Sequence, residues 1–569
     1  MGNRKLKWWV IPTLIVIVVA IIIGIAFGIV SLVGNKNNST ESTNTTQSRQ
    51  QETIAPATDK SNDNSKSDSN NNSEKTEITE IAEITETTES TEDTETIKGY
   101  VNTFSGYTSL FASNGGNVTQ DGSNFDQAGL NVEIYIEDDD DKIIEAFKNG
   151  EIQFFAMTVN KMALVSKQLE DCNIETVMPF FLDTSTGGDG IVTDSSVKTI
   201  TDLKNVKIGM AKNSVSTAIP VWFLNESGLS EADVQEIVDN FVLFDSTQEA
   251  VDAFISGEVG AVSTWNITGA LEKEDSHILF STASAEYLVI DGIVFSKEFA
   301  ESHESEITTM IDAILTTVND INNDVNVEAY YDAIRQSVPD FSDYSDEDLA
   351  DELSYAKFLS FNGNLEALDV ANDIYKDFCK VWKQLGYETN DEYELINDSY
   401  IISLSSEWNG KESSTSSSIT NNAEDYIDQE ALITQYAKVL FNGDSAEFKT
   451  GYEQTNKELL DEFIKVAKIL NKTVIKISGH VNLGTGSSVW DEETQSYKIA
   501  PGFTSSEFAY KLSLMRAETV KEYMVSQGID EDRIIIEGLG GDYPIDTNDT
   551  EEGQANNRSS EISFYQAGY

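Results

Sequence analysis

Residues 206–224 read VKIGMAKNSVSTAIPVWFL, and their pattern predicts the fold of the surrounding chain. The opening Val206–Met210 is typical of a buried strand, and the apolar run Ala218–Leu224 is typical of a helix. Asn213–Thr217 lie between the two, so they follow a strand and precede a helix. A strand, a polar turn and a helix in this order form the building unit of α/β domains with parallel sheets.

The same alternation continues on both sides of this stretch, from Ile97 to about Glu394. The clearest predicted strands are Asn131–Ile136, Val206–Met210, Ala261–Trp265 and Gly292–Phe295. The clearest predicted helices are Ser230–Asn240, Gln248–Ser256 and Glu304–Asn319. We therefore predict an α/β domain with mainly parallel sheets over residues 97–396.

The N-terminal segment 8–33 (WWVIPTLIVIVVAIIIGIAFGIVSLV) contains no charged side chain. A transmembrane helix needs about 20 apolar residues, and this run is longer. Arg4, Lys5 and Lys7 precede it, so the positive-inside rule places residues 1–7 in the cytoplasm. A cleaved signal peptide is the alternative, but its apolar core has only about 7–15 residues and ends in a small-residue cleavage site, which this sequence lacks. We predict a single-pass protein of the cell membrane whose bulk lies outside the cytoplasm.

Two low-complexity segments separate the predicted domains. Residues 34–96 consist mainly of Asn, Ser, Thr, Glu and Gln, and such a segment buries too little apolar surface to fold. We predict that it is a disordered stalk. Residues 397–424 include the run KESSTSSSITNN and are predicted to be a linker, and a third unit, residues 425–569, follows.

The composition limits the possible partners and cofactors. The formal net charge is −60, from 98 acidic and 38 basic residues, which argues against binding of nucleic acid or anionic lipid. Two cysteines and three histidines are too few and too scattered for a Cys- or His-based metal site. The sequence contains no nucleophile elbow, P-loop or zinc motif. We therefore expect a protein that is not an enzyme and needs no cofactor or metal.

A series of short phrases occurs in an order that resembles one family of transport proteins. The phrases are Gly106–Phe111, Gly129–Val132, Ala146–Ile152, Gly187–Val192, Thr201–Lys204, Ser214–Ser216 and Ser263–Trp265. They resemble the substrate-binding proteins of ABC importers, in the branch for nitrate, sulfonates, taurine and thiamine precursors. Gln153 departs from the pattern, since the family usually has Asp there. The resemblance implies a two-lobed periplasmic-binding-protein fold, a small polar or anionic solute in the cleft and ABC permease subunits as partners.

Strand-end positions suggest which residues would contact that solute. Asn213–Thr217 offer hydroxyl and backbone N–H groups at a helix N-terminus, which suits an anionic or polar group. Ordinary N-capping by Ser214 or Ser216 is the alternative. Trp265 is expected to be either a wall of the cleft or a core residue, and the same two alternatives apply to Tyr107. The predicted ligand-binding residues are Ser105, Tyr107, Thr158, Asp189, Ser214, Ser216 and Trp265.

Several aspartates bear on the class of ligand. Asp183, Asp189, Asp245, Asp291 and the run Asp138–Asp141 include residues that are expected near strand ends. Carboxylates at those positions would favour an amine-bearing ligand over an oxyanion. For the run of four aspartates, a solvated loop is the alternative interpretation.

Residues 437–565 contain a second ordered series of phrases. The phrases are Val439–Phe441, Val474–His480, Leu512–Val520, Arg533–Gly538 and Asn556–Arg558. The first is predicted to be the entry strand. A helix is predicted from apolar residues at helical spacing, namely Leu460, Phe463, Ile464, Ala467 and Leu470. The phrases resemble the OmpA-like peptidoglycan-binding domain, an α/β sandwich. The resemblance implies that Arg516 binds a carboxylate of the wall peptide, since Arg can hold a carboxylate through two hydrogen bonds. A surface cation on a helix is the alternative for Arg516.

Two positions depart from that family. Asn482 stands where the family has an Asp that contacts the ammonium end of the wall peptide, and Ser559 replaces the second Arg of an Asn-Arg-Arg ending. The inserted loop 485–507 contains three consecutive acids, 491–493, and is an alternative source of a carboxylate. The predicted peptidoglycan-binding residues are Asn482, Arg516 and Arg558.

The sequence therefore indicates a membrane-anchored, extracytoplasmic solute-binding protein of an ABC-type importer, tethered to the cell wall by an OmpA-like domain. The alternative is a cell-envelope scaffold or sensor whose binding-protein fold has no transport role. A flagellar-stator-like protein also joins one span to an OmpA-like domain. Its span needs an ionisable proton carrier, however, and residues 8–33 contain none.

Overall fold

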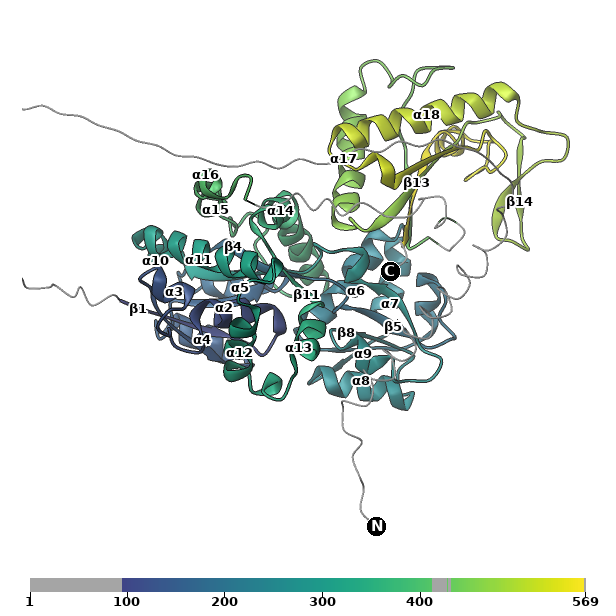
Figure 1. Cartoon of the computed structure of the whole chain (residues 1–569). Coiled ribbons are helices and arrows are strands. Elements are labelled where there is room, and N and C mark those ends of the chain that lie inside the picture. The colour runs from purple at the N-terminus through teal and green to yellow at the C-terminus, as the bar shows by residue number, and fades with distance from the viewer. Residues whose placement is uncertain (1–94, 412–426, 428–430, 567–569) are drawn as a thin grey trace, which may run out of the picture. The chain divides into compact units, whose positions relative to one another are not determined.

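The computed structural model describes residues 95–411, 427 and 431–566 (Figure 1). The predicted spanning segment 8–33 and most of the predicted stalk lie outside the described residues. Within the described ranges, no helix is both long enough and apolar enough to cross a bilayer. The membrane anchor therefore stays a prediction.

The first lobe is built on a six-stranded sheet with the strand order β11-β4-β10-β3-β1-β2. Its strands are β1 (Thr96–Val101), β2 (Asn131–Ile136), β3 (Phe154–Thr158), β4 (Thr176–Ser185), β10 (Ile290–Ser296) and β11 (Ala356–Phe358). β1 pairs parallel with β2 and β3, whereas β10 pairs antiparallel with β3 and β4. The first four strands therefore all end at one edge of the sheet, and β10 begins there.

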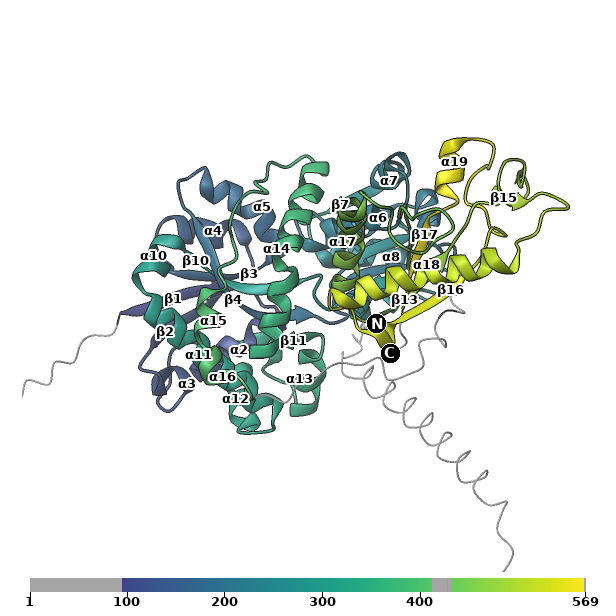
Figure 2. The same ribbon diagram turned by 90° about the horizontal axis from the view of Figure 1, so that it is seen from above.

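Helices cover both faces of this sheet (Figure 2). One face packs against α4 (Asp140–Lys148), α5 (Val159–Glu170) and α14 (Phe361–Gln384), and the other packs against α2 (Thr108–Asn114), α11 (Glu304–Asn322) and α12 (Val327–Ser337). Shorter helices are η1 (Ser105–Tyr107), α3 (Asn124–Gln127), α10 (Lys297–Ser302), η4 (Pro339–Phe341) and α13 (Asp346–Leu353). In β3, Phe155 and Met157 join one core while Phe154 and Ala156 join the other. Because alternate side chains of a strand point to opposite faces, an apolar strand can be buried on both sides.

The second lobe has a five-stranded sheet with the order β7-β6-β8-β5-β9. Its strands are β5 (Gly190–Thr193), β6 (Ile208–Ala211), β7 (Phe241–Phe244), β8 (Ala261–Thr264) and β9 (His277–Ser281). Its helices are η2 (Ile200–Asn205), α6 (Val215–Glu226), α7 (Glu231–Val238), α8 (Thr247–Ser256) and α9 (Ile267–Ala270). Apolar residues of α8 and α9 form one core with the sheet, and those of α7 and η2 form another.

The chain passes between the lobes twice. Residues 186–189 lead from β4 to β5, and residues 282–289, which include η3 (Thr282–Ser284), lead from β9 to β10. β5 follows the first crossing and β10 follows the second. Each begins at the edge of its sheet where the parallel strands of that sheet end. β5 and β10 therefore run antiparallel to their neighbours. The expectation of mainly parallel sheets is wrong for this reason, since both sheets are mixed.

Most predicted elements of this domain are confirmed, with small shifts at their ends. β2 has the predicted bounds, whereas the strand predicted at Val206–Met210 begins at Ile208 and the one predicted at Ala261–Trp265 ends at Thr264. The helix predicted at Ser230–Asn240 is α7, and the Ser230 side chain caps it by accepting a hydrogen bond from the backbone N–H of Asp233.

The folded part of the domain extends beyond the predicted boundary at residue 396. α15 (Ser399–Ser403) and α16 (Ser405–Trp408) lie within the predicted linker 397–424. Tyr400 and Trp408 are buried, and the indole N–H of Trp408 donates to Asp312 Oδ1 at 2.7 Å. The predicted linker is therefore wrong over residues 397–408, because a few buried aromatic and apolar side chains fix an otherwise polar segment.

The C-terminal domain has a four-stranded sheet with the order β12-β17-β13-β16. Its strands are β12 (Ile433–Ala437), β13 (Thr473–Gly479), β16 (Ile534–Gly538) and β17 (Ser560–Gln566). Its helices are α17 (Glu453–Ile469), α18 (Glu507–Ser526), η6 (Glu531–Arg533) and α19 (Glu551–Asn556), and the inserted loop forms a hairpin of β14 (Ser488–Asp491) and β15 (Ser496–Ile499). As the helical spacing predicts, Leu460, Phe463, Ile464 and Ala467 form the buried face of α17.

The first strand of this domain lies earlier than predicted. β12 ends at Ala437, and the Val439 N–H then donates to the Ala437 carbonyl at 2.8 Å. This three-residue turn breaks the strand before the predicted segment Val439–Phe441. Phe441 makes an isolated bridge with Phe448 instead.

Candidate functional site

Side chains at the ends of neighbouring strands of the first sheet form a row. Asp291 on β10 lies opposite Thr158 on β3 and opposite Asp183 on β4, and Asp183 lies opposite Phe358 on β11. This is the edge at which β1, β2, β3 and β4 end, and open α/β sheets bind ligands outside the carboxyl ends of their strands. We use the name acid cluster for Asp183, Asp291 and Asp189, the last of which lies in the first crossing.

Asp183 is completely buried, and neither carboxyl oxygen has a hydrogen-bond partner within the described chain. The η1 turn lies directly against it, because a Cβ atom on Gly106 would come within 2.3 Å of the carboxyl group. Glycine at position 106 is therefore needed for this close approach. A buried carboxyl without partners is costly, so it calls for a physical explanation.

Asp291 is almost as buried and has one hydrogen bond. The Tyr107 hydroxyl donates to Asp291 Oδ1 at 2.5 Å, while Oδ2 has no partner among the described residues. Tyr107 is also buried, and its ring meets that of Phe104 edge to face with centroids 5.5 Å apart. Burial and the negative charge of Asp291 raise the pKa of Tyr107 well above its usual value, so Tyr107 remains a donor.

The carboxyls of the acid cluster hold protons more tightly than an exposed aspartate does. Burial raises the pKa of Asp291 to about 7 and the pKa of Asp189 to about 6, although hydrogen bonds from Tyr107 and Ser185, respectively, oppose these shifts. Burial also raises the pKa of Asp183 well above its usual range, and the charges of Asp291 and Asp189 add to this effect. Within the described chain, the charges acting on Asp183 and Asp291 are those of other carboxyls and not of basic side chains.

Thr282 joins the two crossings beside the acid cluster. Its Oγ1 lies 2.9 Å from the Ser185 Oγ and accepts hydrogen bonds from the backbone N–H groups of Gly187 at 3.0 Å and Asp189 at 3.2 Å. The Thr282 N–H donates to the Asp189 carbonyl at 2.9 Å. The two segments that connect the lobes are therefore bonded to each other.

Four of the predicted ligand-binding residues lie at this edge of the first sheet. Tyr107 bonds to the acid cluster, Asp189 belongs to it, and Ser105 is buried at the start of η1. Thr158 caps α5, since its hydroxyl oxygen accepts from the Lys161 N–H at 3.0 Å. The structure thus brings these four residues to the edge of the sheet at which β1, β2, β3 and β4 end. Asp183 and Asp291 lie at the same edge.

The other three predicted residues lie at the corresponding edge of the second sheet. Ser214 precedes α6, but its hydroxyl donates to the Ala211 carbonyl at 2.8 Å and does not cap the helix. Ser216 is buried, and its hydroxyl has no partner in the described ranges. Trp265 follows β8 and is 58% exposed, so the core alternative for Trp265 is wrong.

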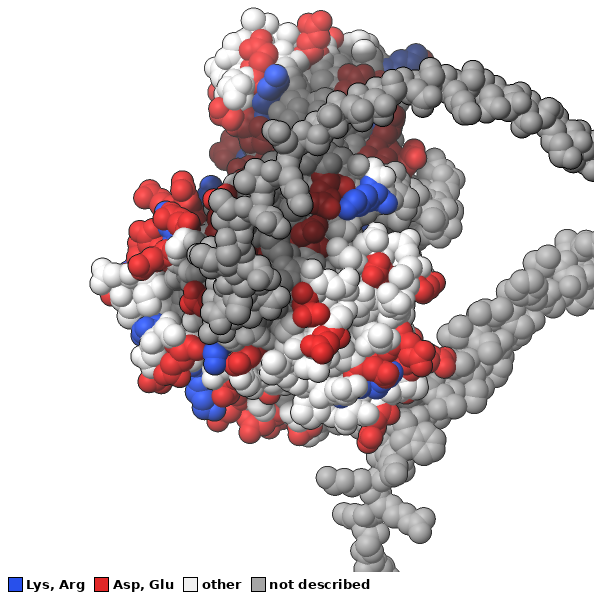
Figure 3. Space-filling model, turned by 60° about the vertical axis from the view of Figure 1, so that its left-hand side comes forward, with Lys and Arg blue, Asp and Glu red and all other residues white. Residues whose placement is uncertain are grey.

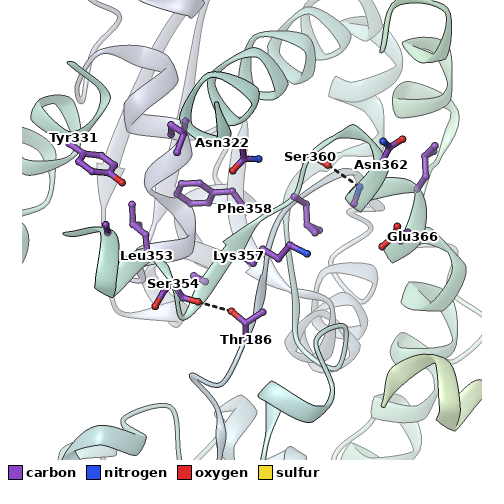
Figure 4. Close-up of a pocket in the computed structure, with 16 residues that line it drawn as sticks. Thr186, Asn322, Tyr331, Leu353, Ser354, Lys357, Phe358, Ser360, Asn362 and Glu366 are labelled. Atoms are coloured by element: carbon purple, nitrogen blue, oxygen red, sulfur yellow. Dashed lines mark hydrogen bonds between the residues drawn. The ribbon is translucent and has the colours of Figure 1, made fainter. Parts of the chain in front are cut away.

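A cavity of about 700 Å³ opens beside the same strand ends (Figure 4). Its lining includes Thr186 of the first crossing, Tyr331 of α12 and Glu366 of α14. Phe358, the β11 residue paired with Asp183, also lines it. The sequence does not reveal this cavity, because its walls come from segments that are far apart in the chain.

The other aspartates that we considered have local roles. Asp138 accepts hydrogen bonds from the backbone N–H and hydroxyl of Thr103, and Asp139 caps α4. Both are exposed and precede α4, whereas Asp140 and Asp141 begin that helix and Asp140 pairs with Lys161, so the solvated-loop alternative holds only for the first two aspartates of the run. Asp245 forms an exposed ion pair with Lys212 at 2.7 Å.

In the C-terminal domain, Arg516 is buried rather than exposed on α18, so the surface-cation alternative is wrong. Its Nε donates to the Ser445 carbonyl at 3.1 Å, and its guanidinium lies 4.9 Å from the centre of the Phe441 ring. Burial lowers the pKa of Arg516, and the charge of Arg558 contributes. The two predicted arginines therefore lie close enough to interact.

The side chain of Asn482, the third predicted wall-binding residue, makes its hydrogen bond within its own loop. Asn482 Oδ1 accepts from the Gly484 N–H, and Asp491 of the inserted loop pairs with Lys498 at 2.9 Å within the hairpin. The acid whose charge acts on Arg516 is Asp444. The sequence alone does not mark Asp444, because the loop that carries it reaches α18 only in the folded domain.

Comparison with known proteins gives two family matches in separate parts of the chain. Residues 117–324 match the model of the family described as NMT1/THI5 like, and residues 440–558 match the OmpA family. The chain joins these two kinds of domain. This confirms the fusion that the ordered phrases predicted.

One curated relative and two solved structures illustrate these similarities. "Outer membrane protein A" of Bordetella avium is 36% identical over 131 residues, which are 22% of this chain and 57% of that protein. The chain thus spans little more than half the length of this relative. The aliphatic sulphonate binding protein SsuA from Escherichia coli is 13% identical with a TM-score of 0.41 and covers 54% of this chain and 99% of its own. A putative sulfonate-binding SsuA from Methylobacillus flagellatus is 17% identical with a TM-score of 0.40 and covers 56% and 95%, respectively.

Proposed function

We propose that this chain is an extracytoplasmic receptor that binds a small polar solute between the two lobes of its first domain. Residues 186–189 join the end of β4 to the start of β5, and Gly190 of β5 pairs with Thr264 at the end of β8. Four residues span at most about 14 Å. The carboxyl ends of the strands in the two lobes therefore face each other across a short distance, and this arrangement carries the proposal.

Buried polar groups on both lobes support a solute at this position. Asp183 and Asp291 in the first lobe, and Ser216 and Ser263 in the second, each keep a buried oxygen without a hydrogen-bond partner in the described chain. A polar solute would supply those partners, which would offset the cost of burying the groups. The NMT1/THI5-like match over residues 117–324 supports the assignment of this domain to the solute-binding type of fold.

We also propose the setting in which the receptor works. A helix formed by residues 8–33 would anchor the chain in the cell membrane with the bulk outside the cytoplasm, and an ABC permease would receive the solute. The OmpA-like domain would hold peptidoglycan through Arg516, Arg558 and Asn482. The OmpA family match and the proximity of the two arginines support this part.

Thermal unfolding of the purified full-length chain in detergent tests the solute site. Nitrate, methanesulfonate, taurine, bicarbonate, pyrimidines, phosphonates and small amines are added singly, and a true ligand should raise the melting temperature because it binds the native state. Trp265→Ala should lower the affinity for that ligand. It should not lower the melting temperature of the ligand-free protein, since the side chain is already exposed. No response to any compound would favour the scaffold or sensor function.

Sedimentation with purified peptidoglycan tests the wall tether separately. The full-length chain should sediment at low and at moderate salt. Failure under both conditions would refute the wall function and leave the solute-binding proposal intact.

A further inference from the structure

Three carboxyl oxygens at the centre of the acid cluster lack hydrogen-bond partners in the described residues. They are both oxygens of Asp183 and Oδ2 of Asp291, on paired positions of adjacent strands. Both side chains are at most 1% exposed. Two neighbouring carboxyls buried without a cation are unfavourable, because burial and mutual repulsion both oppose ionisation. Either bound protons or a bound cation must compensate for this arrangement.

The surroundings fit an organic cation better than a metal ion. Among the described residues, no group of three or more His, Cys, Asp or Glu side chains is arranged to hold a metal. The group bonded to Asp291 is instead the buried phenol of Tyr107, and the Tyr107 ring in turn packs edge to face against the ring of Phe104. Aromatic faces and carboxylates together are typical surroundings of organic ammonium groups.

We propose that the acid cluster binds the primary ammonium group of a small organic solute between Asp183 and Asp291. A primary ammonium has three N–H donors, and the cluster offers three carboxyl oxygens that lack partners. Tyr107 holds the fourth oxygen, Asp291 Oδ1, and so orients that carboxylate. Asp189 adds a third negative charge from the first crossing. This inference rests on the proposed solute-binding function and names the class of solute.

Access to the cluster requires the two lobes to separate. Gly106 of η1 lies against Asp183 on the side of the first lobe, and the crossings that join the lobes are bonded to each other through Thr282. Rotation about these crossings is the motion that would expose the strand ends, as in other hinged two-lobed proteins. Closure then buries the ammonium with the carboxylates, where the interaction is strongest.

The surface charge also favours a cation. Acidic side chains are spread over the face shown in Figure 3, with few basic ones among them, and the net charge of the chain is −60. A strongly negative surface raises the local concentration of cations and repels anions. This long-range field acts in the same direction as the acid cluster.

Thermal unfolding of the full-length chain in detergent at pH 8 tests the inference with two sets of probes. Ethanolamine, putrescine and agmatine carry primary ammonium groups, whereas methanesulfonate and nitrate are anions. Choline serves as a cation without an N–H donor. We expect at least one primary amine to raise the melting temperature by several degrees, and we expect choline and the anions to leave it unchanged.

Isosteric variants then locate the site. Asp183→Asn should weaken binding of the active amine at least tenfold in calorimetric titration, and Asp291→Asn should do the same. Asp369→Asn, on the exposed face of α14, removes the same charge from the surface and should leave the affinity unchanged. Far-ultraviolet circular dichroism of each variant establishes that it is folded, so two independent variants report on the site.

The outcomes separate this inference from the proposed function. A response to anions but not to amines would overturn the ammonium site and leave the solute-binding function standing. A response to choline equal to that of the amines, or equal losses in Asp183→Asn and Asp369→Asn, would also overturn it. No response to either set of probes would count against both proposals.

Discussion

Asp291 gives the ligand-free protein a dependence on pH whose sign follows from its raised pKa. An aspartate in the unfolded chain titrates near about 3.9, whereas burial raises the pKa of Asp291 in the folded protein to about 7. Between these values the folded state binds a proton more tightly than the unfolded state does. The contribution of Asp291 to stability therefore falls as the pH rises from about 4 to about 7 and stays low above that.

Asp291→Asn should for this reason stabilise the ligand-free chain at pH 8, by roughly 2–4 kcal/mol, and much less at pH 4.5. The amide keeps an oxygen that can accept the Tyr107 hydroxyl. Urea unfolding at the two pH values measures the difference, with Asp369→Asn as the matched control. An equal effect of Asp291→Asn at both pH values would show that this carboxyl does not titrate as described.

Asn482→Asp should strengthen sedimentation with peptidoglycan. The substitution keeps the oxygen that accepts from the Gly484 N–H and adds a negative charge for the ammonium end of the wall peptide. Charge-assisted hydrogen bonds contribute about 1.5–3 kcal/mol, so we expect a rise in affinity of at least about tenfold. Gln527→Glu adds the same charge at an exposed position after α18 and should have no effect. A gain in both variants would point to net charge and not to this site.

At the scale of single residues, the sequence predicts which side chains lie near strand ends but not which of them are in contact. The sequence marked Asp183, Asp189 and Asp291 as acids near strand ends, and Tyr107 as a ligand candidate. It did not place Asp183 opposite Asp291, because that contact depends on the register of two strands more than a hundred residues apart. The sequence also did not predict the burial of Arg516 against Phe441, because this contact depends on how α18 packs against a segment far away in the chain.

At the scale of elements, the end of α17 is held by one side chain from another element. Arg533 of η6 is buried, and its guanidinium donates to the carbonyl oxygens of Ala467 at 3.1 Å, Leu470 at 2.7 Å and Thr473 at 2.9 Å. The carbonyls of Ala467 and Leu470 lie at the end of α17, and that of Thr473 belongs to the first residue of β13. Helix ends leave such groups without partners inside the helix.

Arg533→Leu should therefore lower the free energy of unfolding of the C-terminal domain by about 3–5 kcal/mol, since three buried carbonyls would lose their donor. Arg533→Lys should restore only part of the loss, because an ammonium lacks the planar fork of guanidinium. Denaturant unfolding followed by a probe in this domain measures both variants. Full recovery with Lys would mean that charge alone, and not the fork, stabilises the helix end.

The elements also show what periodicity can and cannot predict. Apolar and polar spacing located β2, α7 and the buried face of α17, because these features are local. It did not give the direction of β5 and β10, which depends on where the chain crosses between the lobes. The polar composition of residues 399–408 predicts a linker, although Trp408 anchors the two helices that form there.

At the scale of the whole molecule, Thr282 links the two crossings on which any motion of the lobes depends. Thr282→Val keeps the shape of the side chain and removes the acceptor used by Gly187 and Asp189. We expect a loss of about 1–3 kcal/mol in the free energy of unfolding of the first domain. Thr316→Val removes a hydroxyl that donates within α11 to the Asp312 carbonyl and should cost clearly less. Equal losses in urea unfolding would show that the crossings have no special role in stability.

The domain order was the most predictable property of the molecule. Two ordered series of short phrases predicted the fusion, and family matches over residues 117–324 and 440–558 confirm it. Each phrase is weak, but the order is informative because it samples the whole length of a domain. The position in the membrane and attachment to the wall stay predictions, since they concern surroundings that the described residues do not include.

The shortness of the first crossing has a kinetic consequence. A solute that binds the acid cluster in the first lobe meets the second lobe as part of the same molecule, only four residues of chain away. Short connections of this kind give effective concentrations on the order of millimolar or above. Contacts from Ser216 and Ser263 that are far too weak to capture a free solute would then be sufficient to slow its escape. Residence time, rather than the rate of capture, is the quantity that the second lobe would control.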